Sequence, residues 1–169
     1  TPRGSYIPYT GVGELFRSPL ELGWGWNVDL DSHDFVGREA IKAEVAAGGP
    51  ARRLVGLEWN SEDVVEVFAS MFGDGPTLFP MELPRYIGGE YDEIRMDGQR
   101  VGCSTSRVYS PTLRKMISLG VIAKELAQPG TQVTVLWGPP GTPQKDIRCT
   151  VASLPFKKDN RRVDASTVE

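Results

Sequence analysis

The stretch VGCSTSRVYSPTLRKMISLGVI, residues 101–122, decides the fold that the sequence predicts. Its first half alternates with a period of two, which predicts a β-strand over residues 100–109. Four side chains are expected on one face of that strand: Val101, Cys103, Thr105 and Tyr109. The turn formers of residues 110–112 then lead into a second predicted strand, residues 115–122. Two strands joined by so short a turn indicate an antiparallel sheet.

Further strands and helices are predicted on both sides of this pair. Three more runs have β-forming residues bounded by turn formers: residues 53–59, 131–137 and 147–154. Two runs have helical spacing with capping or stop signals: residues 37–47 and residues 61–72. Residues 73–90 are rich in proline and glycine and read as an irregular connection. The sequence therefore predicts a mainly β fold with a few helices, in an antiparallel barrel or sandwich.

The composition limits the classes of partner. The 169 residues carry a net charge of −3 and the pI is near 5.3, whereas a nucleic-acid surface needs clustered basic residues. No apolar run approaches the roughly 20 residues that span a bilayer, and no signal-peptide leader is seen. Cys103 and Cys149 are too few for a disulfide framework and are expected to be buried free thiols. We therefore expect a cytoplasmic protein without a nucleic-acid or membrane partner.

No complete catalytic or metal site is visible in the residues. Residues 138–145 have the glycines and lysine of a phosphate loop, but their prolines and the strand that follows predict a plain hairpin connection. His33 is either a catalytic or pH-sensitive group or a turn residue ahead of a helix. Glu21 is expected on the surface, although its apolar neighbours leave burial open. The sequence predicts no catalytic residue and no metal site.

Two pairs of residues are candidates for ligand binding. Trp24 and Trp26 offer aromatic faces to a planar ligand, or pack in the core of a domain junction. Arg161 and Arg162 either hold a carboxylate or belong to a solvated tail. Residues 1–34 hold many aromatic residues but no sustained period, so we expect them to pack against something larger.

Specific runs occur here in the same order as in a known family. The first is SPLELGWGWNVDLDSHDFVGREAI, residues 18–41. RLVGL, residues 53–57, follows it, and then the strand and turn of residues 101–113. With the closing LPF, residues 154–156, the match extends over about residues 9–162. The sequence resembles the C-terminal region of the glycine-cleavage T-protein (aminomethyltransferase) family.

The resemblance implies a small antiparallel β-barrel over residues 51–156. Residues 1–50 would be the end of a folate-binding α+β core with a linking helix, and residues 157–169 a polar tail. The implied cofactor is tetrahydrofolate, and three residues fall at cofactor-binding positions: Tyr9, Trp26 and Arg161. In the family the earlier domains build the folate cavity and supply the acidic catalytic residue. The implied partners are a small-molecule methyl donor and a missing N-terminal region, in the same chain or a separate subunit, and the isolated chain is expected to be inactive.

Departures from a typical T-protein bear on the substrate. The helix of residues 61–72 and the stretch around residues 81–84 are inserted, and residues 136–141 precede the last strand. These features resemble the branch with tetrahydrofolate-dependent O-demethylases of vanillate and syringate, in which a methyl group passes from an aryl ether to tetrahydrofolate. We favour that activity over aminomethyl transfer in glycine cleavage. The remaining hypotheses are a non-catalytic folate- or partner-binding barrel and the terminal folate domain of a dimethylglycine- or sarcosine-oxidising enzyme.

Overall fold

The computed structural model describes residues 4–7, 11–84 and 88–157. In these ranges the chain forms six strands: β1 (Arg52–Trp59), β2 (Tyr91–Met96), β3 (Gln99–Ser110), β4 (Lys115–Ala123), β5 (Gln132–Trp137) and β6 (Lys145–Ala152). The helical elements are α1 (Arg38–Ala46), α2 (Ser61–Ala69) and the 3-10 turns η1 (Val12–Leu15), η2 (Gly25–Asn27) and η3 (Lys124–Leu126). None of the described helices is long and apolar enough to cross a bilayer.

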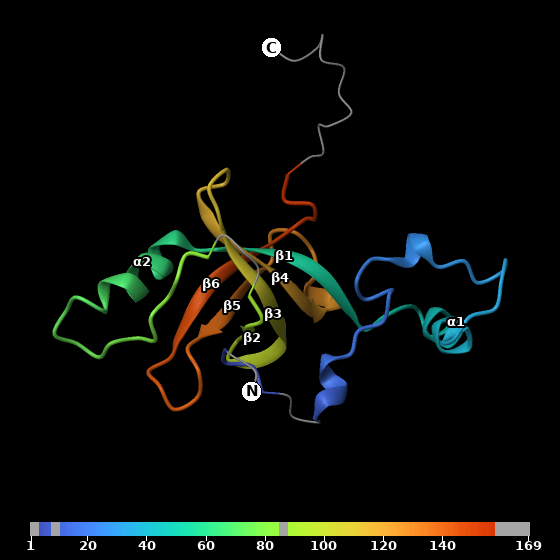
Figure 1. Cartoon of the computed structure of the whole chain (residues 1–169), viewed down its shortest axis with the longest axis horizontal. Coiled ribbons are helices and arrows are strands. Elements are labelled where there is room, and N and C mark those ends of the chain that lie inside the picture. Colours follow the sequence, from blue (N-terminus) through green and yellow to red (C-terminus); the bar gives the residue numbers. More distant parts are fainter. Residues whose placement is uncertain (1–3, 8–10, 85–87, 158–169) are drawn as a thin grey trace, which may run out of the picture.

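The strands form one closed antiparallel barrel with the order β1-β4-β3-β2-β5-β6 (Figure 1). Strand β1 closes it, because it pairs with β4 over most of its length and with β6 over Gly56–Trp59. A closed sheet has no free edge strand on which another chain could add. The structure confirms the mainly β fold and the antiparallel barrel that the sequence and its resemblance predict.

Strand β2 is the element that the sequence analysis missed. Its sequence, YDEIRM, is mostly charged or polar, so the segment lacks the apolar alternation of a half-buried strand. The turn after it, Asp97-Gly98, has positive φ at both residues, 50° and 75°. Such a two-residue turn matches the twist of a hairpin. The Asp-Gly pair was therefore the available signal for a β2–β3 hairpin.

A β-bulge in β3 changes which side chains share a face. Thr105 pairs with Leu119, but the next paired residue is Val108, with Ile117, so β3 has one residue more than β4 in this interval. Ser106 in the bulge has a φ of 57°. Tyr109 then lies opposite the buried Met116, on the core side. The expectation that Thr105 and Tyr109 share one face was wrong, because a bulge reverses the alternation.

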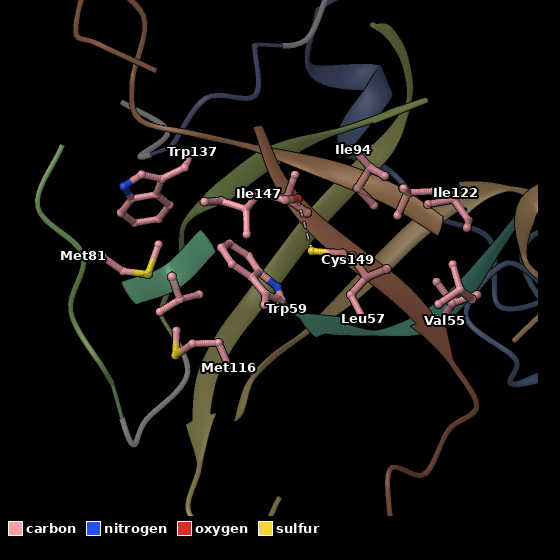
Figure 2. Packing of buried hydrophobic residues seen from close by; sticks show 14 of the residues in the cluster. Val55, Leu57, Trp59, Met81, Ile94, Met116, Ile122, Trp137, Ile147 and Cys149 are labelled. Atoms are coloured by element: carbon pink, nitrogen blue, oxygen red, sulfur yellow. Dashed lines mark hydrogen bonds between the residues drawn. The ribbon is translucent and has the colours of Figure 1, made fainter. Parts of the chain in front are cut away.

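A small hydrogen-bonded group lies within the mainly apolar interior of the barrel. Figure 2 shows Leu57, Ile94, Ile122 and Ile147, which are fully buried, in the same cluster as Trp59. The indole Nε1 donates to Ser118 Oγ at 2.9 Å, and Ser118 Oγ shares a second hydrogen bond of 2.9 Å with Ser104 Oγ. The polar atoms of this buried group are thereby satisfied, as a dry core requires.

Helix α2 begins where the sequence predicts, at an N-cap asparagine. Asn60 Oδ1 accepts a hydrogen bond from the backbone N–H of Asp63 at 3.0 Å. Asp63 in turn accepts from Arg148 Nη2 of β6 at 2.7 Å, and hydrogen bonds from Arg148 hold the pKa of the Asp63 carboxyl below its usual range. The helix start is therefore fastened to the barrel wall.

Residues 11–50, called the arm below, lie on the opposite side of the barrel from α2 (Figure 1). Glu21 attaches the arm to β1: its carbonyl accepts from Leu54 N at 2.8 Å, and its carboxylate accepts from Arg52 Nε at 2.6 Å. Glu21 is only 7% exposed, so the expected surface position was wrong. The apolar neighbours of Glu21 in the sequence were the correct signal of burial.

Replacing Ser118 by alanine should destabilise the barrel by about 1–3 kcal/mol, because the Trp59 indole N–H stays buried without an acceptor. Urea unfolding followed by tryptophan fluorescence measures this free energy. The matched control is Ser153→Ala, which removes an exposed hydroxyl outside the barrel strands. Equal stability of the two variants would contradict the role assigned to Ser118.

Candidate functional site

Of the three cofactor-binding residues that the resemblance implies, one lies in the described structure. Trp26 is part of η2 on the arm and is 85% exposed, and Trp24 beside it is 58% exposed. Neither indole is packed in a core within the described ranges, although the sequence favoured core packing. Tyr9 and Arg161 lie outside the described residues, as does Arg162. The assignment of the three to a cofactor stays a prediction.

The arm exposes an unusual amount of apolar surface. Its large exposed side chains are Val12, Phe16, Trp24, Trp26, Val36 and Val45. Helix α1 buries none of its residues. Soluble proteins rarely leave so many large apolar groups in water, and such surfaces usually contact another body. The apolar side chains of the arm are therefore left uncovered by the described residues.

A second site is a cleft of about 830 Å³ at one end of the barrel, called the end cleft below. It opens beside the start of β2, the bulged part of β3 and the end of β5. Its lining brings together residues that are far apart in the sequence: Gly4, Phe79, Glu90, Asp92, Arg107 and Trp137. The end cleft is thus a product of the fold rather than of any one motif.

Residues 79–84, called the cover segment below, form one wall of the cleft. The Phe79 carbonyl accepts from Trp137 Nε1 at 2.7 Å, and the Pro84 carbonyl accepts from Tyr109 N at 2.8 Å. Between them Met81 is 3% exposed and points into the core cluster (Figure 2). Met81 therefore plugs the barrel end, while Phe79 and its neighbours stay at the rim.

Residues 4–6, called the strap below, contribute Gly4 to the lining of the cleft. Ser5 Oγ donates to the Leu136 carbonyl of β5 at 2.7 Å and accepts from Glu93 N of β2 at 2.9 Å. Strands β2 and β5 pair directly only at Ile94 and Arg95, so the strap bridges them where they diverge. Gly4 has a φ of +103°, and a side chain there would collide with the Tyr91 carbonyl. This close approach requires glycine.

Arg107 lies at the floor of the end cleft and is 6% exposed. Its guanidinium carbon lies 4.4 Å from the ring centroid of Trp137 and 5.9 Å from that of Trp59. Nη1 donates to the Glu82 carbonyl at 3.3 Å, but Nε–H has no hydrogen-bond partner in the described structure. Burial lowers the pKa of Arg107, because the charged guanidinium loses its hydration there.

Asp92 is the acidic counterpart and is 2% exposed. Burial raises the pKa of its carboxyl to about 6. The hydrogen bond from the Ser5 backbone N–H, 3.1 Å, and the charge of Arg107 act in the opposite direction, while Glu90 adds to the increase. Carboxyl groups with such raised pKa values are more common at functional sites than elsewhere.

The sequence analysis did not single out any charged residue of the end cleft. Asp92 belongs to the missed strand β2, and Arg107 follows a bulge that a period of two does not reveal. The sequence of β3 gives no clear signal, because the strand holds a second arginine, Arg100. The β2–β3 hairpin, in which Asp92 pairs with Ser104, places Asp92 close to Arg107.

Other sequence expectations can be compared with the structure. Cys103 and Cys149 are buried free thiols, as predicted, and burial raises the pKa of the Cys103 thiol to about 12. Residues 138–144 connect β5 to β6 as a plain hairpin loop, as predicted. His33 is exposed ahead of α1, with Nδ1 2.8 Å from Ser32 Oγ. In the described part of the chain, no group of three or more His, Cys, Asp or Glu residues is arranged to hold a metal ion.

Comparison with known proteins gives a family match over most of the chain. Residues 52–158 match the family model of the glycine cleavage T-protein C-terminal barrel domain. Sesamin methylene transferase of Sinomonas sp. (strain No.22) is 39% identical over 167 residues, covering 90% of this chain and 36% of the relative. Syringate O-demethylase of Sphingobium sp. is 36% identical over 165 residues, covering 90% and 35%.

More distant matches agree on the architecture. The aminomethyltransferase of Desulfitobacterium hafniense is 34% identical over 119 residues, covering 70% of this chain and 26% of the relative. The crystal structure of aminomethyltransferase T from Bartonella henselae superposes with a TM-score of 0.56 at 22% identity, over 83% of this chain and 32% of that one. The chain therefore spans between about a quarter and about a third of the length of these curated relatives.

Replacing Asp92 by asparagine should remove a pH-dependent loss of stability. Between the ordinary pKa of 3.8 and the raised value of about 6, the native state keeps a proton that the unfolded chain has released. The free energy of unfolding of the wild type should therefore fall, relative to that of D92N, by on the order of 2–3 kcal/mol as the pH rises from about 4 to about 6.5. Urea unfolding across this range measures the difference.

The control for this experiment is Asp74→Asn, which changes an exposed carboxylate in the loop after α2. Its difference from the wild type should stay constant with pH. A constant difference between wild type and D92N would show that the Asp92 carboxyl titrates alike in both states.

Proposed function

Because this chain belongs to the glycine cleavage T-protein family through its C-terminal barrel domain, we propose that it is the C-terminal part of a tetrahydrofolate-dependent methyltransferase. Its proposed reaction is the O-demethylation of a methoxylated aromatic compound such as vanillate or syringate. The observation that carries this choice is the extent of the matches. The alignments with sesamin methylene transferase and syringate O-demethylase have higher identity and cover more of the chain than that with the aminomethyltransferase of D. hafniense.

Two alternatives have their own support. Aminomethyl transfer in glycine cleavage is supported by the name of the matching family model and by the aminomethyltransferases among the relatives. A non-catalytic module that binds folate or a partner protein is supported by the exposed aromatic side chains of the arm, among them Phe16 and Trp26.

The arm offers chemistry that fits a folate cofactor in part. Within the described ranges the indole of Trp26 makes no ring contact, so its faces are available to stack on a planar heterocycle. Tetrahydrofolate, when bound, supplies the ring nitrogen that accepts the methyl group. The proposed contribution of this chain is to bind and orient that ring and to exclude water with the exposed apolar residues beside Trp26, such as Phe16 and Trp24.

The rest of the proposed site comes from outside this chain. The chain spans about a third of its relatives, and the end cleft lies at the barrel rather than on the arm. We propose that the remaining polypeptide, in the same chain or as a separate subunit, covers the apolar arm and supplies the catalytic acid. The methyl donor would be a small molecule. The cytoplasmic location expected from the sequence stays a prediction.

The isolated chain should bind tetrahydrofolate only weakly, because one stacking surface without the rest of a cavity gives little binding free energy. Isothermal titration calorimetry, with a full-length syringate O-demethylase as the reference, measures this. An affinity close to that of the reference would favour the folate-binding module over the fragment of an enzyme.

In the native gene product, Trp26→Ala should weaken tetrahydrofolate binding by about 1–3 kcal/mol, which is the usual cost of losing a stacked aromatic partner. The rate of demethylation of vanillate or syringate, measured as release of the phenol, should decrease together with the affinity. The matched control is Phe72→Ala, an exposed aromatic residue just after α2, on the other side of the barrel. Activity with neither aryl ether, together with transfer from an aminomethylated carrier, would instead support the T-protein alternative.

A further inference from the structure

The end cleft contains a buried donor that neither the barrel nor the proposed one-carbon transfer uses. Arg107 Nε–H has no hydrogen-bond partner in the described structure, although the residue is 94% buried. An unpaired buried donor of this kind costs free energy, so most such groups in folded proteins have a partner. Nε itself is fully buried, so an acceptor bound in the cleft would meet the guanidinium at Nη2, which has no hydrogen-bond partner in the described structure.

The other charges of the cleft are negative. Asp92, Glu90 and Glu82 line it together with Arg107, and their charges act on the pKa of its guanidinium. In the described chain none of the three forms a direct ion pair with Arg107. The lining of the cleft therefore combines one guanidinium group with three carboxylates. A purely anionic ligand is opposed by these carboxylates, and a purely cationic ligand leaves the Arg107 guanidinium without a counter-charge.

The remaining walls are apolar and leave room for a side chain. Phe79 is 41% exposed at the rim, and Pro80 and Pro139 lie beside it. Trp137 is covered on one face by the Arg107 guanidinium and contacts Phe79 with its ring, at a centroid distance of 6.1 Å. A volume of about 830 Å³ accommodates a ligand with a ring and two charged groups.

We propose that the end cleft binds a zwitterionic amino acid with an apolar side chain. Its carboxylate accepts from Arg107 Nη2, its ammonium group donates to Glu90 or Asp92, and its side chain packs against Phe79. A zwitterion complements both signs of charge in the cleft, which neither a simple acid nor a simple amine does. This site is separate from the arm and does not depend on the proposed methyl transfer.

Three ligands that differ by one charged group test the proposal on the 169-residue chain. They are L-phenylalanine, 2-phenylethylamine, which lacks the carboxylate, and 3-phenylpropionate, which lacks the ammonium group. Calorimetric titration should show L-phenylalanine binding about tenfold or more tightly than either analogue, because each missing group removes a charge-assisted hydrogen bond. No saturable binding of L-phenylalanine, or equal binding of an analogue, would overturn the proposal.

Variants then assign each charge. Arg107→Gln should reduce the affinity for L-phenylalanine to that for 2-phenylethylamine, and Glu90→Gln should reduce it by severalfold, because Asp92 remains. The control is Arg53→Gln, an exposed arginine of β1 outside the cleft. An equal loss in Arg53→Gln would contradict the assignment. If Arg107→Gln does not fold, because its guanidinium packs on both tryptophans, Arg107→Lys and the ligand series on the wild type decide the question.

Indole N–H signals in a heteronuclear NMR spectrum locate the bound ligand. Trp137 Nε1 donates to the Phe79 carbonyl at the cleft wall, so its signal should shift on addition of L-phenylalanine. The signal of Trp26, on the arm, should stay in place. A shift of Trp26 without a shift of Trp137 would place the ligand on the arm and overturn the proposal.

Discussion

Backbone hydrogen bonds between β1 and β6, from the Gly56–Ala152 pair to the Trp59–Cys149 pair, close the sheet on itself. Closure excludes water from the inner face, so the buried indole of Trp59 has to find its acceptor inside the barrel, at Ser118. The two open ends of so short a barrel are then covered by loops. The same strand β1 receives the arm through Glu21, so one strand is both the closing element and the anchor of the apolar surface.

The two candidate sites differ in what supports them. The arm carries the residue that resemblance to a family implies, Trp26, on an exposed surface with few internal contacts. The end cleft has no counterpart in that resemblance, but it has buried charges that cost stability in the isolated barrel, at Arg107 and Asp92. Proteins keep such costly groups where they serve specificity, binding or catalysis more often than elsewhere. The support for a site on the arm is therefore similarity to relatives, and the support for a site in the cleft is the free-energy cost of its buried charges.

The sequence predicted most strands and both α-helices, because Asn60 and the alternation in β5 are local signals that agree with the fold. It failed at β2, whose Asp92 carboxylate accepts from the strap and whose Glu93 carboxylate pairs with Arg95, so both charges are buried rather than in solvent. The β3 bulge was also missed, because nothing at Ser106 announces a positive φ. The end cleft could not be predicted, since its walls come from segments that meet only after closure. The resemblance supplied Trp26, which spacing alone left undecided.

The strap affects the order in which parts of this barrel fold. Ser5 is synthesised before the six strands of the barrel, yet its acceptor at Leu136 lies 131 residues later and its donor at Glu93 lies 88 residues later. The hairpin of β2 and β3 pays little loop-closure entropy and assembles early, whereas the joint at Ser5 has to wait for β5. The seam between β2 and β5 is thus sealed near the end of folding by residues that precede all six barrel strands in the sequence. Until then both strand edges stay open to water and to other chains.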